Sequence, residues 1–326
     1  MIKFNQLLIL LCFVFLYSIP LKSQQNSSWS SYYENGFVWN PALTARWNTW
    51  EVSSTYRKEW TGFKGAPENG TLGFQYPFIK RFTTMTVGGF LEHDNVGPFQ
   101  STGVAGTYCY KIRPRFFGRR DDVLSFGIKA GLYQYNFDPY DLVAYDQPEG
   151  DPLLPSNVSS TVPDFAGGIF YTSVSDFYSF KSHYYAGLAV NKILPLQVKA
   201  YLAQPITNSV HINIHGGYRY FPFRAKYYLE PNVFVNYAFD RPMNIMAATR
   251  FEMIDKFWLS AGAVTNGDVF GQLGVIFDKK SMIGSIVNDG TLRMGVKVDY
   301  SMGGLRKYSG VGYEFYMAYL FSNEPY

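Results

Sequence analysis

The chain has 326 residues and a formal net charge of +4, and its 27 Tyr and 28 Phe bring the aromatic share to 19%. A hydrophobic share of 47% excludes a disordered chain, and so weak a positive charge gives no reason to expect a nucleic-acid partner. Only 17% of the residues are charged, and because Tyr and Phe favour strands and interfaces, the composition argues against a soluble helical enzyme.

Residues 1–23 have the pattern of a secretory signal peptide. Lys3 precedes an apolar run from Leu7 to Ile19, and the small residue Ser23 follows it. The run is shorter than the roughly 20 apolar residues that a spanning helix needs, so we expect export and cleavage near Ser23. Its removal would leave Cys109 as the only cysteine, which excludes a disulfide framework in the mature chain.

From residue 47 onward, short segments alternate between apolar residues and polar residues or glycine. In the last segment, Val311, Phe315 and Met317 share one face, whereas Gly312 and Glu314 share the other. A period of two with one apolar face is typical of a half-buried strand. Fourteen such strands are predicted, near residues 47–58, 69–78, 81–92, 99–112, 122–137, 163–174, 180–192, 208–220, 224–239, 243–253, 256–265, 268–278, 290–301 and 308–321.

These segments predict an all-β fold, a closed antiparallel transmembrane β-barrel of the outer membrane with about 14 strands. Export, segments of roughly ten residues, aromatic strand ends and a second face of polar residues and glycine are the signature of such barrels. A soluble exported sandwich would also alternate, but its strands are usually shorter. Residues 24–46 are then a periplasmic leader or a lumen plug, residues 47–326 form the barrel, and an even strand count places both termini in the periplasm.

The expected loops differ in charge between the two ends of the barrel. No Lys or Arg lies between Lys129 and Lys181, and the expected outer loop at 138–162 contains Asp138, Asp141, Asp146, Glu149 and Asp151. The expected periplasmic turns contain Lys80, Arg81, Arg113, Arg115, Arg119, Arg120, Arg224, Lys226, Lys279 and Lys280. Loop charges of this kind are often only solvated. The alternative is that each end selects a partner by charge, with the acidic set as candidate partner-binding residues and Arg113, Arg115, Arg119 and Arg120 as candidate periplasmic contacts.

The sequence contains no recognisable catalytic or cofactor-binding motif, so we expect neither enzyme activity nor a cofactor. His211 and His215 are four residues apart, which on a strand separates them by roughly 13 Å. They cannot bind one metal ion together and are expected to face the lumen. The acidic outer loop does not match an EF-hand. A hydrolase would need a serine and a carboxylate within reach of His93 or His183.

Fragments spread over almost the whole mature chain resemble one known family when their order and spacing are taken together. They are Asn40-Pro41-Ala42, Tyr56-Arg57 with Trp60, Gly62-Phe63-Lys64-Gly65-Ala66-Pro67, Asp94-Asn95-Val96-Gly97-Pro98, Leu124-Ser125-Phe126-Gly127, Pro163-Asp164-Phe165, Gly217-Tyr218-Arg219-Tyr220, Leu229-Glu230-Pro231 and Val298-Asp299-Tyr300-Ser301. The set resembles the PorP/SprF family of outer-membrane proteins of the type IX secretion system. The stretch Gln24-Gln25-Asn26-Ser27-Ser28 departs from the Gln-Asp-Pro run that this family tends to have. Pro41 and Pro67 are expected to flank strands, where a missing N–H is tolerated.

The resemblance implies a non-enzymatic accessory that supports secretion or cell-surface attachment of large client proteins, such as gliding adhesins, through their C-terminal sorting domains. Its partners would be the outer-membrane bilayer, other components of the secretion machinery and a client's sorting domain. Candidate partner-binding residues on the first outer loop and its rim are Tyr56, Arg57, Trp60, Gly65, Ala66 and Pro67. The alternative role for Tyr56, Arg57 and Trp60 is interface anchoring and lumen filling. The alternative function is a transport barrel for a small or hydrophobic solute, which an open lumen or a lateral gap would favour.

Overall fold

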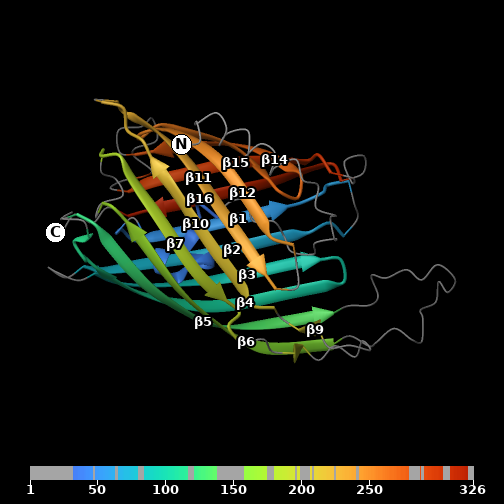
Figure 1. Ribbon diagram of the computed structural model, residues 1–326. Helices are drawn as coiled ribbons and strands as arrows, with labels where there is room; N and C mark the ends of the chain where they lie inside the picture. The colour runs from blue at the N-terminus through green and yellow to red at the C-terminus, as the bar shows by residue number, and fades with distance from the viewer. Residues whose placement is uncertain are drawn as a thin grey trace, which may run out of the picture.

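Fourteen antiparallel strands close into a barrel in the computed structural model (Figure 1). The structure describes residues 32–46, 48–62, 65–79, 84–116, 121–137, 158–174, 180–194, 197–198, 206–207, 209–223, 225–239, 242–278, 287, 290–303 and 309–321. The barrel strands are β1 (Glu51–Lys58), β2 (Glu68–Ile79), β3 (Thr84–Val96), β4 (Phe99–Ile112), β5 (Val123–Phe137), β6 (Val158–Thr172), β7 (His183–Asn191), β10 (His211–Arg219), β11 (Tyr227–Ala238), β12 (Asn244–Met253), β13 (Phe257–Val264), β14 (Asp268–Phe277), β15 (Thr291–Ser301) and β16 (Val311–Leu320). A two-stranded hairpin of β8 (Gln197–Val198) and β9 (Ile206–Thr207) lies between β7 and β10 in sequence.

Each barrel strand pairs with its neighbours in chain order, and β1 closes the ring by pairing with β16. Glu51 pairs with Leu320, so the first and last strands begin and end at the same end of the barrel. We call this the periplasmic end, following the topology predicted above. The predicted strand number is confirmed, and the prediction for β4 coincides with the observed strand. The largest difference is at β6, which begins at Val158 instead of residue 163.

The alternation of side chains along the strands separates a lipid-facing wall from the lumen, as predicted. On β5, Ile128 is 63% exposed and Leu132 is 54% exposed, whereas Lys129 and Tyr133 between and beside them are buried. In a closed barrel every strand has two neighbours, which satisfies the backbone groups that lipid cannot bind. Tyr133 of β5 and Tyr316 of β16 alternate with the lipid-facing residues and are buried in the interior. Within the described residues, no helix is long and apolar enough to cross a membrane.

Residues 32–46 lie inside the ring of strands, and we call them the lumen segment (Figure 1). The segment contains the short helix α2 (Gly36–Trp39) and the 3₁₀ turn η1 (Pro41–Leu43). Its apolar side chains pack against apolar residues of the wall, in one cluster made of Phe37, Val38, Ala42, Leu43, Phe90, Ala105, Phe170 and Tyr185. Apolar burial of this kind keeps the segment inside the barrel.

The two prolines that were expected to flank strands have different positions. Pro67 directly precedes β2, as expected. Pro41 instead begins η1 inside the lumen, where the missing N–H of a proline is tolerated because the first N–H groups of a helical turn have no partner within it. The expectation for Pro41 was wrong because its sequence neighbours do not show that the chain turns into the barrel before β1.

Candidate functional site

Asn40 fastens the middle of the lumen segment to two strands. Its side-chain oxygen accepts a hydrogen bond from the Ala42 N–H at 3.0 Å, which caps η1. Its amide nitrogen donates to the Ile169 carbonyl of β6 at 3.1 Å and lies 3.0 Å from His215 Nε2 of β10. Asn40 is fully buried, so these bonds take the place of water.

Glycines of the wall leave room for this part of the segment. A Cβ atom on Gly127 of β5 would lie 2.1 Å from the Ala42 nitrogen, and one on Gly168 of β6 would lie 2.1 Å from Asn40 Oδ1. Real Cβ atoms do not approach so closely, so any other residue would displace the segment. The glycines on the polar faces of these strands therefore form a hollow that fits Asn40-Pro41-Ala42.

The residues after η1 are held by the next group of strands. The Thr86 hydroxyl of β3 donates to the Thr44 carbonyl at 2.9 Å. The Ala45 N–H donates to Gln75 Oε1 of β2 at 2.6 Å, and Lys111 Nζ of β4 donates to the Ala45 carbonyl at 2.7 Å. Backbone groups that no helix or sheet ladder satisfies are thus bonded to side chains of the wall.

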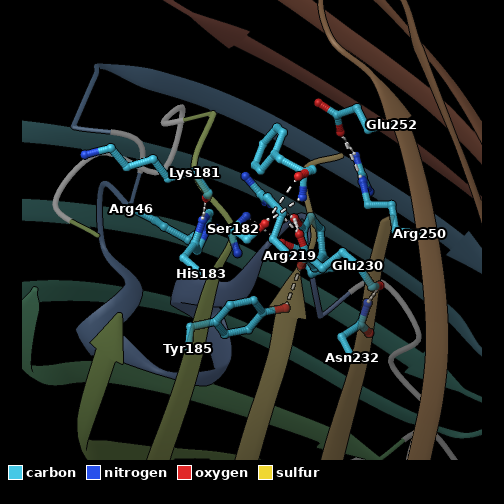
Figure 2. Close-up of polar contacts among 12 residues, drawn as sticks. Arg46, Lys181, Ser182, His183, Tyr185, Arg219, Glu230, Asn232, Arg250 and Glu252 are labelled. Atoms are coloured by element: carbon cyan, nitrogen blue, oxygen red, sulfur yellow. Dashed lines mark hydrogen bonds and ion pairs between the residues drawn. The ribbon is translucent and has the colours of Figure 1, made fainter. Parts of the chain in front are cut away.

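At the other end of the segment, Tyr33 joins a buried charge network. Arg219 donates to the Tyr33 hydroxyl at 2.6 Å, and that hydroxyl donates to Glu230 Oε2 at 3.1 Å. Arg219 Nε also donates directly to the same carboxylate oxygen at 2.6 Å, and the Tyr185 hydroxyl donates to Glu230 Oε1 at 2.6 Å (Figure 2). Burial raises the pKa of the Tyr33 hydroxyl above its ordinary value, so it stays protonated and can donate.

Glu34 extends this network around the barrel. Arg250 of β12 donates to Glu34 Oε1 at 2.7 Å and to Glu252 Oε2 at 2.8 Å, and Arg293 of β15 donates to the same Glu252 oxygen at 2.8 Å. Gln272 of β14 donates to Glu34 Oε1 at 3.0 Å. We call the charged members the inner ion cluster: Glu34, Arg219, Glu230, Arg250, Glu252 and Arg293.

A second cluster of charges lies nearer the opposite end of the lumen. Arg57 of β1 contacts Glu59 at 3.0 Å, and Asp299 of β15 and Glu314 of β16 at 3.4 Å each. Lys297 lies 3.7 Å from Glu314. Burial raises the pKa of the Glu59 carboxyl above its usual range, and the nearby Arg57 opposes that change. These five residues are the outer ion cluster.

The candidate partner-binding residues near the first outer loop lie in different places. Arg57 is buried in the outer ion cluster, so it has the alternative role of filling the lumen. Tyr56 is 41% exposed on the lipid-facing wall. Trp60 follows β1 with a left-handed φ of 46°. The Gly65 carbonyl accepts from the Gly97 N–H at 3.1 Å, and Ala66 and Pro67 are buried.

The loop that follows β1 is fixed to two neighbouring turns. Besides the bond between Gly65 and Gly97, the Thr61 N–H donates to the Val311 carbonyl at 3.3 Å, and the Gly62 N–H donates to the Ser309 carbonyl at 3.2 Å. The structure therefore brings residues from three parts of the chain together at this rim.

Among the candidate periplasmic contacts, Arg113 and Arg115 are exposed at the turn between β4 and β5. The buried carboxylate of Asp122 organises this turn, because it accepts from the Arg115 N–H at 3.0 Å and the Phe116 N–H at 2.7 Å. Lys226 is also exposed. The other candidate residues lie outside the described part of the chain, as does the expected signal peptide: Lys80, Arg81, Arg119, Arg120, Asp138, Asp141, Asp146, Glu149, Asp151, Arg224, Lys279 and Lys280.

Two of the histidines have the lumen positions expected of them, and the other two have polar neighbours. His211 and His215 face the lumen. His93 Nδ1 lies 2.9 Å from the Thr102 hydroxyl, and His183 Nδ1 lies 2.8 Å from the Lys181 carbonyl. A threonine hydroxyl and a backbone oxygen do not make up the serine, histidine and carboxylate set of a hydrolase. Within the described residues, no group of three His, Cys, Asp or Glu side chains is arranged to hold a metal ion.

Sequence reasoning missed the inner ion cluster. Arg219 and Glu230 belong to fragments that carry the family resemblance, but no role was attached to them. Tyr33 and Glu34 precede the first strand, where no alternation indicates a buried face. The available signal was a set of charges on the polar faces of β10, β11, β12 and β15 near their periplasmic ends, which need partners in a closed lumen.

Comparison with known proteins identifies the family. A family model described as "Type IX secretion system membrane protein PorP/SprF" matches residues 21–319. The chain belongs to this family. The resemblance drawn from the motifs is thereby confirmed, and the family is of a non-enzymatic kind, with partners in the outer-membrane bilayer and among the components of the secretion machinery.

Solved structures with the same fold are outer-membrane barrels. The toluene transporter TodX of P. putida is 7% identical, with a TM-score of 0.51, and the match covers 88% of this PorP/SprF chain and 93% of that one. The monoaromatic hydrocarbon channel CymD is 11% identical, with a TM-score of 0.51, and the match covers 90% and 93% of the two chains. At such low identity these likenesses show the fold alone. No curated protein matches the sequence significantly.

Proposed function

We propose that this PorP/SprF protein is a non-enzymatic scaffold that supports secretion or surface attachment of large, adhesin-like client proteins through their C-terminal sorting domains. The observation that carries the proposal is the lumen segment. Its hydrogen bonds reach β1, β2, β3, β4, β6, β7, β10, β11, β12 and β14. The segment lies in the space that a solute would have to pass, which supports a scaffold over a channel.

Recognition at the two ends of the barrel is the remaining role. Polypeptide cargo in a folded state is too wide for a barrel of this size, whose interior is filled by side chains and by the lumen segment. In this proposal a client's sorting domain contacts the outer rim at Tyr56, Trp60, Gly65, Ala66, Pro67 and the acidic residues of 138–151, while Arg57 supports the rim from inside. Arg113, Arg115, Arg119 and Arg120 face machinery components in the periplasm.

The N-terminal part of the chain fits the same proposal. Residues 1–23 direct export and are cleaved near Ser23, and the lumen segment of the mature chain then closes the barrel. Such an arrangement uses the N-terminal extension of the mature chain to seal a barrel that serves as a docking surface. Mass spectrometry of the mature N-terminus tests the cleavage site, and a mature chain that began downstream of residue 32 would contradict the sealing role.

The test of function compares surface proteins on intact cells with and without the gene for this protein. We expect at least one large surface protein to disappear in the deletion strain, to return when the gene is restored, and other exported proteins to persist. The alternative is a transport barrel, since TodX and CymD are described as hydrocarbon channels. An unchanged surface proteome together with lost uptake of a small hydrophobic solute would replace the scaffold proposal with that alternative.

A further inference from the structure

The wall of the barrel changes along the strand β6. All fifteen residues of β6 pair with β5, from Val158 opposite Phe137 to Thr172 opposite Val123. On the other side, β7 pairs only with residues Gly167 to Thr172. One more bond runs from the Ile193 N–H to the Phe165 carbonyl at 3.0 Å. Among the described residues, no strand pairs with residues 158–164 on the side away from β5, and we call these residues the β6 edge.

The direction of the free backbone groups follows from the register. In an antiparallel ladder, the N–H and C=O of one residue point to the same side, and successive residues alternate. The Phe165 carbonyl points away from β5, and the pairing with β5 is regular. The backbone groups of Ser159, Thr161 and Pro163 therefore also point away from β5. Proline in a sheet is confined to positions whose N–H would face no partner strand. Pro163 therefore occupies a position that suits an edge.

The surroundings of the β6 edge are polar. Ser159, Thr161 and Pro163 are exposed. The side chain of Gln134 on β5 donates to the Ser159 hydroxyl at 3.0 Å, so the outer surface of both strands is polar at this level. The apolar surface begins at Phe165, which is 41% exposed. The hairpin of β8 and β9 lies next to β6, but its two strands pair with each other (Figure 1).

We propose that the β6 edge binds one extended strand of a client protein, which adds to the barrel sheet by backbone hydrogen bonds. The inference rests on the proposed function and names where and how the client is held. A row of alternating backbone donors and acceptors recognises an extended strand, because only a strand offers matching groups at the same spacing. The chain from residue 138 to residue 151, which precedes β6 in the sequence, contains five Asp or Glu and no Lys or Arg, so a client strand flanked by Lys or Arg is favoured.

The substitution Thr161→Pro tests the edge directly. It removes an N–H that points away from β5 and costs no bond in the β5–β6 ladder, as Pro163 already shows two residues later. Thr161→Ala is the matched control, because it removes the same side chain and keeps the N–H. We expect Thr161→Pro to reduce the surface amount of the dependent client about tenfold and Thr161→Ala to leave it unchanged.

The measurement uses the full-length protein in cells. The deletion strain, a strain restored with the natural gene and strains restored with each variant are compared by mass spectrometry of surface proteins. Heat-dependent migration of the outer-membrane fraction on gels shows whether each barrel is folded. If Thr161→Pro does not fold, Ser159→Pro takes its place, because the N–H of Ser159 also points away from β5.

The outcomes separate this inference from the proposed function. If the deletion removes a surface protein and the folded proline variant retains it, the edge inference is wrong and the scaffold function stands. If the deletion changes no surface protein, the edge inference and the scaffold function are both wrong. If the proline variant leaves the client unchanged but converts a larger detergent-solubilised species into a smaller one, the edge joins two copies of this chain, which also overturns the inference.

Discussion

Two clusters of buried charge lie in the same lumen, but only the inner one includes the lumen segment. In the inner ion cluster, Glu34 of the segment is bound by Arg250 of the wall. In the outer ion cluster, Arg57 is bound by Glu59, Asp299 and Glu314, which belong to or directly follow the adjacent strands β1, β15 and β16. The comparison shows that similar chemistry has two roles: one cluster fastens an insert, and the other joins neighbouring strands.

The two clusters should therefore respond differently to mutation. Removing one partner of a buried ion pair is strongly destabilising, because the other charge stays buried without compensation. That cost applies to both clusters. Only damage to the inner cluster, or to the hollow beside it, should also release the lumen segment and open the barrel.

The largest effect is expected from Gly127→Ala. The new Cβ would lie 2.1 Å from the Ala42 nitrogen and 2.2 Å from the Pro41 carbonyl carbon, and backbone atoms cannot rotate away. We expect the lumen segment to leave its position and the ion conductance of the protein in planar lipid bilayers to rise severalfold. Gly271→Ala is the control, because a Cβ there meets nothing within 4 Å. Unchanged conductance in a folded Gly127→Ala barrel would mean that the segment does not seal it.

The next largest effect is expected from Arg250→Ala. It removes the partner that Glu34 and Glu252 share, and all three side chains are buried. The free energy of unfolding should fall by about 3–5 kcal/mol, and conductance should rise as well. Urea unfolding in lipid vesicles measures the first effect. Arg113→Ala, at an exposed position, should change neither quantity.

A smaller total effect is expected from Arg57→Ala, which separates the roles of the two clusters. The variant leaves three carboxylates close together, with Lys297 3.7 Å from one of them. The free energy of unfolding should fall by about 3 kcal/mol. Conductance should stay at the natural level, because the outer cluster does not hold the lumen segment. If conductance rose as it does in Arg250→Ala, the two clusters would have to be treated as one structural unit.

The sequence was sufficient to predict what depends on local alternation. Because a strand has a period of two, the lumen positions of Arg293, Lys297 and Glu314 could be predicted from their neighbours alone. The pair Glu34–Arg250 could not, since 216 residues separate its members and only closure of the barrel brings them together. The same holds for Asn40 and Gly168. Arg57 was noticed as a motif residue, but its burial depends on carboxylates of strands at the far end of the chain.

The smallest effect is expected from Tyr33→Phe, and it tests whether the charges or the hydroxyl fasten the segment. The variant loses the bonds that link the hydroxyl to Arg219 and Glu230, but these two side chains keep their direct contact at 2.6 Å. The ring remains, and the Arg250 guanidinium lies 4.6 Å from its centre. The free energy of unfolding should therefore fall by only about 1 kcal/mol, with no change in conductance. Tyr56→Phe, on the lipid-facing wall, is the matched control. If the free energy of unfolding fell as much in Tyr33→Phe as in Arg250→Ala, the tyrosine hydroxyl, and not the ion pair of Glu34, would hold the segment in the barrel.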